Sequence, residues 1–530
     1  MGSLGPNLTN SSTPLSATTT FKPLDHEEFR EQAHKMVDYI ADYYKNIENF
    51  PVLSRVEPGY LLTSLPQTAP LGPEPFEAIL GDVNKYIFPG MTHWLNPNFF
   101  AFFPATVSSA AFVGDMLCNA FNSVGFNWLA SPAATELEMV VMDWLASLLK
   151  LPTSFMFSGT GGGVLHGTTS EAIICTLVAA RDRAMETAKF DNPSKLVVYG
   201  SDQTHSTFTK ACKLIGIPPN NIRLISTTVE SKFAMPPSEF RKSIEADVAA
   251  GFVPLYLCVT LGTTSTAAID PLEELVNIAG DYDIWIHLDA AYAGSACICP
   301  EFRHYLNGVE RVDSLSLAPH KWLLTYLDCC CLWVKNPSLL TKTLSTNPEY
   351  LKNKLSESNS VVDYKDWQIG TGRRFKSLRL WFVLRTYGTI NLQNHIRSDI
   401  CMARTFENLV KSDTRFEIVA PANFALVCFR FNPNRKFNPE QIEGLNRELL
   451  ERVNSTGRVY ITHTIAGGIY MLRFAVGTTL TEERHVIAGW EVIKEQAEVI
   501  SMTSKQATNT EKTLSTQRRP TNTSIAEKCG

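Results

Sequence analysis

The sequence predicts an α/β fold, with a mainly parallel sheet in a large domain followed by a smaller α+β domain. Apolar runs typical of buried strands lie at 196–199, 255–259, 284–288 and 315–317. Helical patterns such as 273–279 separate these runs, and this alternation favours a parallel sheet with crossover helices. Such sheets bind ligands at the carboxyl ends of their strands. Four polar residues follow expected strand ends: His205, Thr264, Asp289 and Lys321.

The N-terminal part of the chain reads as a separate segment. Residues 1–20 are rich in Ser, Thr, Asn and Pro, and we expect them to be disordered. Residues 25–46 place apolar side chains on one helical face, and acidic residues crowd the first turn. Prolines interrupt residues 50–92, which we expect to be extended. An amphipathic helix needs a surface to cover it, either in the same chain or in another subunit. We therefore group 21–125 as an N-terminal segment.

A glycine-rich run lies between two predicted helices. Residues 132–150 form a helix opened by Pro132. We then expect a strand from Phe155 that runs into the glycines at 159–163, with a helix opening near Thr168. Glycines allow close backbone approach, and a helix N-terminus offers free N–H groups to an anion. The pattern indicates a phosphate site only weakly, because a plain strand–turn–helix explains it equally well.

The C-terminal half divides into a loop, a helix and a small domain. We expect the large domain to span 126–388 and to include a long loop at about 340–362, a length typical of lids. The small domain should span 389–502. Its expected strands are 416–419, 425–431 and 470–474, and its expected helices are 437–454 and 481–500. The polar tail 503–530 is expected to be disordered.

Bulk properties exclude several classes of protein. The net charge of −5 gives no electrostatic basis for binding nucleic acid or an anionic membrane. No apolar run reaches the length of a membrane span, and no secretory signal opens the chain. The 12 cysteines show no paired CxxC motif and no zinc-ligand spacing, so we expect no metal site. They suggest reduced thiols in a cytoplasmic protein.

Lys321 is the residue that carries the chemical prediction. It lies between an apolar run and Trp322. Burial lowers the pKa of a lysine, and the free amine is the form that attacks a carbonyl. A surface lysine at a strand end is the alternative interpretation. Asp289 ends another apolar run and is followed by small residues, which is typical of an acid that faces a cofactor.

The runs His320-Lys321-Trp322 and Asp289-Ala-Ala-Tyr292 resemble the pyridoxal-phosphate (PLP) enzymes of the aspartate-aminotransferase fold, known as fold type I. More narrowly, residues 21–496 resemble the group II amino-acid decarboxylases, and most of all the plant aromatic amino-acid decarboxylases. The resemblance implies a seven-stranded sheet, with PLP held by Lys321 as a Schiff base and its ring nitrogen held protonated by Asp289. The other cofactor-binding residues that it implies are Thr168, Thr169, Ser170, His205, Thr264 and His320.

The resemblance also implies a homodimer with shared active sites, in which the N-terminal helix packs on the other subunit. Val124 and Phe126 match pocket positions contributed by the neighbouring subunit. Ala318 departs from the Asn of many animal relatives, so a hydrogen bond to the phosphate is lost there. His320 contacts either the substrate or the loop, with core packing as the competing interpretation. The implied substrate-binding residues are Trp94, Phe103, Pro104, Ala105, Val124, Phe126, His205, His320, Tyr350 and Gly372.

Two residues bear on the product and the substrate. Tyr350 lies in an Asn-Pro-Glu-Tyr run, where amine-forming members of the family carry Tyr and aldehyde-forming members carry Phe. We therefore expect Tyr350 to return a proton to Cα after CO2 leaves. Gly372 matches a position where members acting on tryptophan lack a side chain and members acting on tyrosine carry Ser. The resemblance implies decarboxylation of tryptophan, and also of 5-hydroxytryptophan, to the amine.

Four alternatives stay open on the sequence. They are a tyrosine or Dopa decarboxylase, an aromatic aldehyde synthase of the same family, an aminotransferase of the same fold, and a catalytically inactive scaffold protein. The presence of Lys321, Asp289, His205 and Tyr350 argues against the scaffold.

Overall fold

The computed structural model describes residues 22–187, 192–358, 360–433 and 437–517, with side chains described as far as residue 502. The expected disordered N-terminus, 1–20, lies outside the described residues. The described chain forms two compact units. The smaller one comprises 22–49 and 56–90, and the larger one comprises 50–55 and the rest of the chain from residue 91. The expected segment 21–125 is therefore divided near residue 90.

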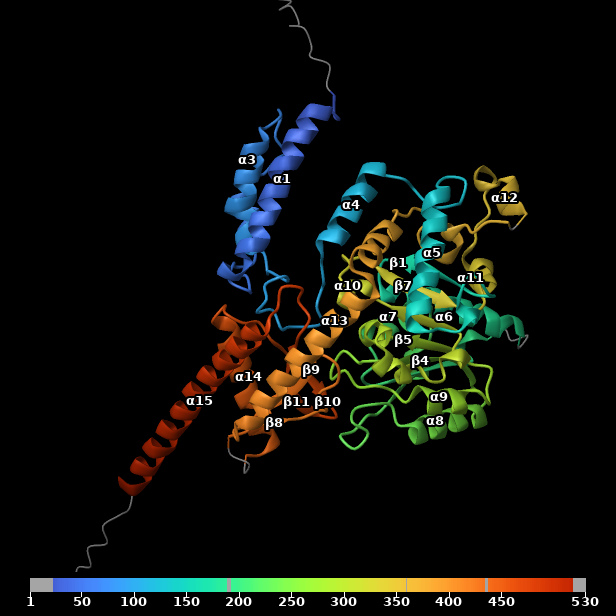
Figure 1. The fold of residues 1–530 in the computed structure, drawn as a ribbon. Helices are drawn as coiled ribbons and strands as arrows, with labels where there is room; N and C mark the ends of the chain where they lie inside the picture. The colour runs from blue at the N-terminus through green and yellow to red at the C-terminus, as the bar shows by residue number, and fades with distance from the viewer. Residues whose placement is uncertain (1–21, 188–191, 359, 434–436, 518–530) are drawn as a thin grey trace, which may run out of the picture. The chain divides into compact units, whose positions relative to one another are not determined.

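The smaller unit is helical (Figure 1). Its elements are α1 (His26–Asn46), η1 (Ile47–Asn49), α2 (Tyr60–Ser64), α3 (Phe76–Asp82), η2 (Val83–Ile87) and η3 (Phe88–Gly90). Asp25 caps α1 by accepting the backbone N–H groups of Glu27 and Glu28 at 3.0 and 3.1 Å. Lys35 of α1 is bonded to Glu77 of α3 at 2.6 Å. No residue of α1 is fully buried: on its apolar face Ala33, Met36 and Ile40 are half-buried, whereas Phe29 and Val37 are exposed.

A seven-stranded sheet forms the centre of the larger unit, in the order β1-β7-β6-β5-β4-β2-β3. The run from β6 to β3 is parallel, and β7 is antiparallel to both β6 and β1. This confirms the predicted mainly parallel sheet. The strands are β1 (Gly162–His166), β2 (Leu196–Ser201), β3 (Ile222–Ile225), β4 (Val253–Thr260), β5 (Trp285–Asp289), β6 (Ser314–Leu317) and β7 (Cys330–Val334).

Both faces of this sheet are covered. Along β4, Leu257 and Val259 belong to one apolar cluster, whereas Tyr256 and Cys258 belong to another. Continuous apolar strands are what a sheet covered on two sides requires. The principal helices of this domain are α4 (Ser109–Phe121), α5 (Pro132–Leu149), α6 (Thr169–Thr187), α7 (Ser206–Leu214), α8 (Pro237–Ala249), α9 (Leu272–Ala279), α10 (Pro319–Trp322), α11 (Pro337–Leu344) and α12 (Lys354–Glu357).

The glycine-rich run corrects one prediction. A strand was expected to end at these glycines, but β1 begins there, after a 3-10 turn at Thr153–Phe155. A Cβ on Gly163 would lie 2.9 Å from Trp333 of β7 and closer still to Met142 of α5. These glycines therefore allow close packing inside the sheet, and they do not serve the predicted phosphate cradle.

The small domain is a four-stranded antiparallel sheet in the order β10-β11-β9-β8. Its elements are β8 (Phe416–Ile418), β9 (Leu426–Phe431), α14 (Pro439–Ser455), β10 (Thr462–Ala466) and β11 (Ile469–Ala475). Helix α13 (Ser377–Ser412) joins it to the large domain and breaks at Gly388, whose φ of +63° favours glycine. The break falls at the predicted domain boundary.

The last helix is longer than predicted. Helix α15 runs over Glu483–Gln517, although the sequence suggested an end near residue 500 and disorder from 503. Residues 490–517 contain neither Gly nor Pro, so nothing in the backbone stops the helix where the apolar pattern ends. The rest of the expected tail, 518–530, lies outside the described residues. Among the described helices, none is long and apolar enough to cross a membrane.

Candidate active site

A cavity of about 180 Å³ opens at the carboxyl ends of the parallel strands. Thr260 ends β4 and Asp289 ends β5, while Lys321 lies in the short helix α10 that follows β6. The structure brings all eight predicted cofactor-binding residues to this one cavity. It is lined by Phe103, Thr168, Thr169, Ser170, His205, Thr207, Thr260, Gly262, Thr264, Asp289, Ala291, Tyr292, His320 and Lys321.

Lys321 has the environment of a reactive amine. Pro319 opens α10, and the backbone N–H of Lys321 donates to the carbonyl of Ala318 at 2.9 Å. Burial lowers the pKa of Lys321, although the negative charge of Asp289 opposes this. The Nζ atom lies 5.8 Å from the centre of the Phe103 ring. A lysine with a lowered pKa on a cavity wall is suited to attack a carbonyl carbon.

Asp289 presents a buried carboxylate to the same cavity. It is 4 % exposed, and one oxygen accepts the N–H of Ala291 at 3.1 Å. Among the described residues, nothing donates a hydrogen bond to its other oxygen. Behind it, the ring of His287 lies between the hydroxyls of Ser314 and Ser316, at 2.8 and 3.1 Å. A buried carboxylate with a free oxygen fits the protonated ring nitrogen of PLP.

The first turn of α6 forms an opposite wall. Thr168, Thr169 and Ser170 line the cavity there, and the hydroxyls of Ser170 and Thr207 contact each other. Backbone N–H groups at the start of a helix of 19 residues suit a phosphate group. Ala318 is buried and offers no side-chain donor. The residues present therefore fit PLP, with hydroxyls and a helix N-terminus at one end and an acid at the other.

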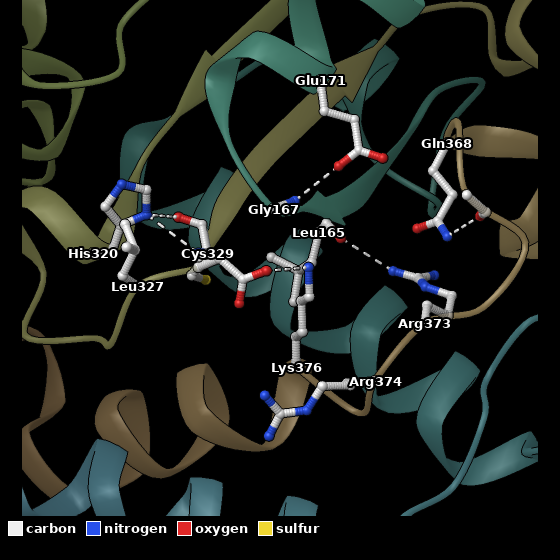
Figure 2. A network of polar contacts seen from close by, with 12 residues as sticks. Leu165, Gly167, Glu171, His320, Leu327, Cys329, Gln368, Arg373, Arg374 and Lys376 are labelled. Carbon is white, nitrogen blue, oxygen red and sulfur yellow. Dashed lines mark hydrogen bonds and ion pairs between the residues drawn. The ribbon is translucent and has the colours of Figure 1, made fainter. Parts of the chain in front are cut away.

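Two histidines line the cavity, and they differ in the hydrogen bond that each Nδ1 makes. His205 caps α7, and its Nδ1 accepts the N–H of Thr207 at 3.2 Å, which leaves the proton on Nε2. Burial and the charge of Lys321 lower the pKa of His205. His320 is buried, and its Nδ1 lies 2.6 Å from the carbonyl oxygen of Cys329 (Figure 2). Burial lowers the pKa of His320 to about 4, so the ring is neutral at neutral pH.

Part of the predicted substrate wall is in place. Phe103 stacks on Tyr292 with ring centres 3.6 Å apart. Thr106 donates its N–H and its hydroxyl to the carbonyl of His320, at 2.9 and 3.2 Å. The neighbouring residues Pro104 and Ala105 are not among the residues that line the cavity. Trp94 does not line the cavity. It stacks on Phe102, 5.6 Å away, and is 41 % exposed.

Four other predicted residues do not reach the cavity within one chain. Tyr350, in the turn η10 (Glu349–Leu351), is 85 % exposed. The segment that carries Val124 and Phe126 lies beside the Gly372 loop, because the N–H of Gly125 donates to the carbonyl of Arg373 at 3.1 Å. None of the four is a cavity-lining residue, so a single chain gives no test of their predicted roles.

Several cavity residues were missed by the sequence analysis. Thr207, Thr260, Gly262, Ala291 and Tyr292 all line the cavity. Thr260 was detectable, because it ends a buried strand just as Asp289 does. Its hydroxyl is buried and has no hydrogen-bond partner among the described residues. In the register of the sheet it lies opposite Asp289.

A reactive lysine, a buried acid and a hydroxyl-lined helix N-terminus on this fold define a PLP-dependent enzyme. The model of the pyridoxal-dependent decarboxylase conserved domain matches residues 58–432. The chain therefore belongs to the pyridoxal-dependent decarboxylases, which are carboxy-lyases that use PLP.

Relatives and solved structures are similar over nearly the whole chain. Tryptophan decarboxylase TDC2 of Camptotheca acuminata is 71 % identical over 479 residues, which is 90 % of this chain and 96 % of that protein. The structure of Catharanthus roseus tryptophan decarboxylase in complex with L-tryptophan shares 66 % identity with a TM-score of 0.86, covering 90 % of this chain and 99 % of the other. Oryza sativa TDC with PLP and tryptamine shares 53 % identity with a TM-score of 0.89, covering 91 % and 100 %.

Proposed function

We propose that this enzyme decarboxylates L-tryptophan, and also 5-hydroxytryptophan, to the corresponding amine and CO2. The observation that carries the proposal is the cavity that gathers Lys321, Asp289, His205 and the first turn of α6. The high identity to proteins named tryptophan decarboxylase supports the choice of substrate. When bound, PLP supplies an electron sink that stabilises negative charge at Cα.

The cavity residues have distinct roles in this proposal. Nζ of Lys321 would hold the cofactor covalently. The free oxygen of Asp289 would keep a proton on the ring nitrogen, which would make the ring an effective sink. The first turn of α6 and its hydroxyls would hold the phosphate, and His205 and Thr264 would face the ring. These assignments are supported by the burial of Asp289 and by the lowered pKa of Lys321.

Proton return to Cα is assigned to Tyr350. Its phenol is 85 % exposed in η10, on the segment between α11 and α12. A positioned general acid contributes about 10²- to 10⁴-fold to such a step. A phenol at this position favours the amine over the aldehyde product. The aldehyde synthase is the second candidate, and it requires that this proton does not arrive.

A homodimer with shared active sites completes the proposal. Val124, Phe126, Tyr350 and Gly372 lie off the cavity of their own chain, which is the arrangement expected if each chain serves its partner's cavity. A second support is the exposure of two apolar side chains of α1, Phe29 at 60 % and Val37 at 46 %. A cytoplasmic location fits the 11 described cysteines, all of which are free thiols.

Product analysis tests the proposal directly. Purified protein with PLP is incubated separately with tryptophan, tyrosine, Dopa and phenylalanine, and amine, aldehyde and peroxide are measured. Tryptamine without peroxide is the expected result. Amine mainly from tyrosine or Dopa would overturn the substrate, and aldehyde with peroxide would overturn the role of Tyr350.

The role of Lys321 has its own test. Borohydride reduction followed by peptide mapping should place the cofactor on Lys321. Lys335 is the matched control, because burial lowers its pKa as well but it does not line the cavity. Lys335→Met should keep the visible absorbance of the bound cofactor, and Lys321→Ala should lose it.

A further inference from the structure

A polar cluster outside the cavity supports His320 from behind (Figure 2). The Nδ1 of His320 lies 2.6 Å from the carbonyl oxygen of Cys329, and the N–H of Cys329 points to the same Nδ1 at 3.2 Å. One Nδ1 cannot donate to the carbonyl and accept from the N–H at the same time. The carbonyl oxygen can only accept and is the closer of the two, so we assign the proton to Nδ1. The Nε2 atom is then an acceptor. No described residue bonds to Nε2.

Two cations at the start of α13, the N-cap residue Lys376 and Arg379, hold the backbone that accepts this bond. The carboxylate of Asp328, which precedes Cys329, is paired with Lys376 at 3.0 Å and with Arg379 at 3.4 Å. Arg379 also donates to the carbonyls of Leu327 and Asp328, at 3.3 and 2.8 Å. One carboxylate and two carbonyls thus tie Leu327 and Asp328 to Lys376 and Arg379.

In this cluster the negative charge of Asp328 is paired with the positive charges of Lys376 and Arg379. Arg379 is 2 % exposed. Burial acts to raise the pKa of Asp328, but the charge and hydrogen bond of Lys376, a backbone hydrogen bond and the charge of Arg379 together hold the pKa below its usual value. Such charge-assisted contacts are stronger than neutral hydrogen bonds. Asp328 is therefore an ionised anchor, whose removal leaves Arg379 buried without this partner.

The same cluster touches the opposite wall of the cavity. A Cβ on Gly167 would lie 3.2 Å from the Asp328 carboxylate and 3.7 Å from the Lys376 nitrogen. The N–H of Gly167 donates to Glu171 of α6 at 3.0 Å. Gly167 directly precedes Thr168, where the hydroxyl-lined wall begins. The Asp328–Lys376 pair therefore lies between the support of His320 and the turn that leads into α6.

We propose that Asp328 is a positioning residue, which fixes the backbone of Cys329 and so holds His320 with Nε2 directed to the bound amino acid as a hydrogen-bond acceptor. Asp328 touches neither the cavity nor the substrate, and it acts through His320. Nε2 accepts a hydrogen bond from an N–H group of the substrate or of the amine product. The inference deepens the proposed function and rests on it for the identity of that ligand.

The test is a double-mutant cycle on the holoenzyme. Asp328→Asn, His320→Gln and the double variant are compared with the parent enzyme. Two quantities are measured: the dissociation constant for tryptamine, titrated through the absorbance of the bound cofactor, and kcat and KM for tryptophan. We expect each single variant to weaken tryptamine binding about tenfold, which corresponds to about 1.4 kcal/mol. The double variant should be no weaker than His320→Gln alone, because both changes remove the same interaction.

Two further variants separate positioning from general damage. Asp115→Asn is the matched control, because Asp115 also pairs with Arg379, at 3.5 Å, but has no contact with Cys329. It should leave tryptamine binding within about twofold. Lys376→Met removes only one of the two cations, and it should repeat the effect of Asp328→Asn in smaller measure even if the latter variant folds poorly.

The test of the role of Asp328 can fail independently of the test of the proposed substrate. Effects of Asp328→Asn and His320→Gln that multiply would overturn the proposal, as would an unchanged dissociation constant in Asp328→Asn. A parent enzyme that forms no tryptamine would contradict the proposed function instead. In that case the cycle is run with the amine of whichever amino acid the parent accepts.

Discussion

Trp322, the residue after Lys321, donates its indole N–H to the carboxylate of Asp399 in α13 at 2.7 Å. Both side chains are buried, and Trp322 also stacks on Tyr292 with ring centres 4.9 Å apart. Tyr292 in turn stacks on Phe103 at the cavity. One hydrogen bond therefore connects the segment that carries the reactive lysine to the long helix between the two domains.

Replacing Trp322 with Phe should lower the stability of the protein by about 1–3 kcal/mol, because Asp399 loses its indole donor while it stays buried. Burial already raises the pKa of Asp399, and the variant should raise it further. The measurement is thermal unfolding of the apoprotein. Trp144→Phe is the control, because Trp144 is 42 % exposed on α5. Equal shifts in the two variants would contradict the role given to the Trp322–Asp399 bond.

Much of the cavity was predictable because its signals are local. A buried strand and the polar residue at its end lie within a few positions of each other, and this identified Asp289 and Lys321. Predicting the strands β2, β4, β5 and β6 required nothing beyond apolar runs and the helices between them. The family resemblance then supplied the chemical roles, which no strand pattern contains.

The parts that the sequence did not predict depend on contacts between distant residues. Gly163 is required by Trp333 of a neighbouring strand, and that neighbour is known only once the sheet order is known. Arg379 and Asp328 are 51 positions apart, so the anchor behind His320 is invisible in the sequence. The end of α15 was missed because a helix without an apolar face gives no periodic signal.

Tyr350→Phe should change the product from amine to aldehyde with peroxide. The phenyl ring keeps the size of the side chain but cannot donate a proton, so amine formation should fall about 10²- to 10⁴-fold. Amine, aldehyde and peroxide are measured together with tryptophan as the substrate. Glu349→Gln, a change at the adjacent residue of the same turn, should leave the product unchanged. An unchanged amine yield in Tyr350→Phe would show that another group supplies the proton.

Gly372→Ser should reduce kcat/KM for tryptophan about tenfold or more and should improve the ratio in favour of tyrosine, because a hydroxyl takes space from the indole and suits a phenol. A Cβ on Gly372 would meet nothing within 4 Å, and no positive φ restricts this residue. The variant should therefore fold normally, and its effect on selectivity should arise at the partner's cavity in the proposed dimer.

Gly370→Ser is the matched control for Gly372. A Cβ there would meet only the carbonyl of Gly372, at 3.8 Å. Both variants are compared by competition between tryptophan and tyrosine in one reaction. A similar loss of tryptophan preference in Gly370→Ser would mean that the loop as a whole sets the preference, and not the absence of a side chain at 372.

His287 should make stability depend on pH between about 4 and 6.5. Burial lowers the pKa of His287 from 6.5 to about 4. Within this window the unfolded chain binds the proton and the folded protein does not, so the free energy of unfolding falls as the pH falls. The contribution is about 1.4 kcal/mol per pH unit, and about 3 kcal/mol in total. His287→Gln should remove this part of the slope in urea unfolding of the apoprotein. Other buried groups titrate in both proteins, so the difference isolates His287. His304→Gln, an exposed site, should keep the parent slope, and equal slopes in all three proteins would show that His287 is not neutral in the fold.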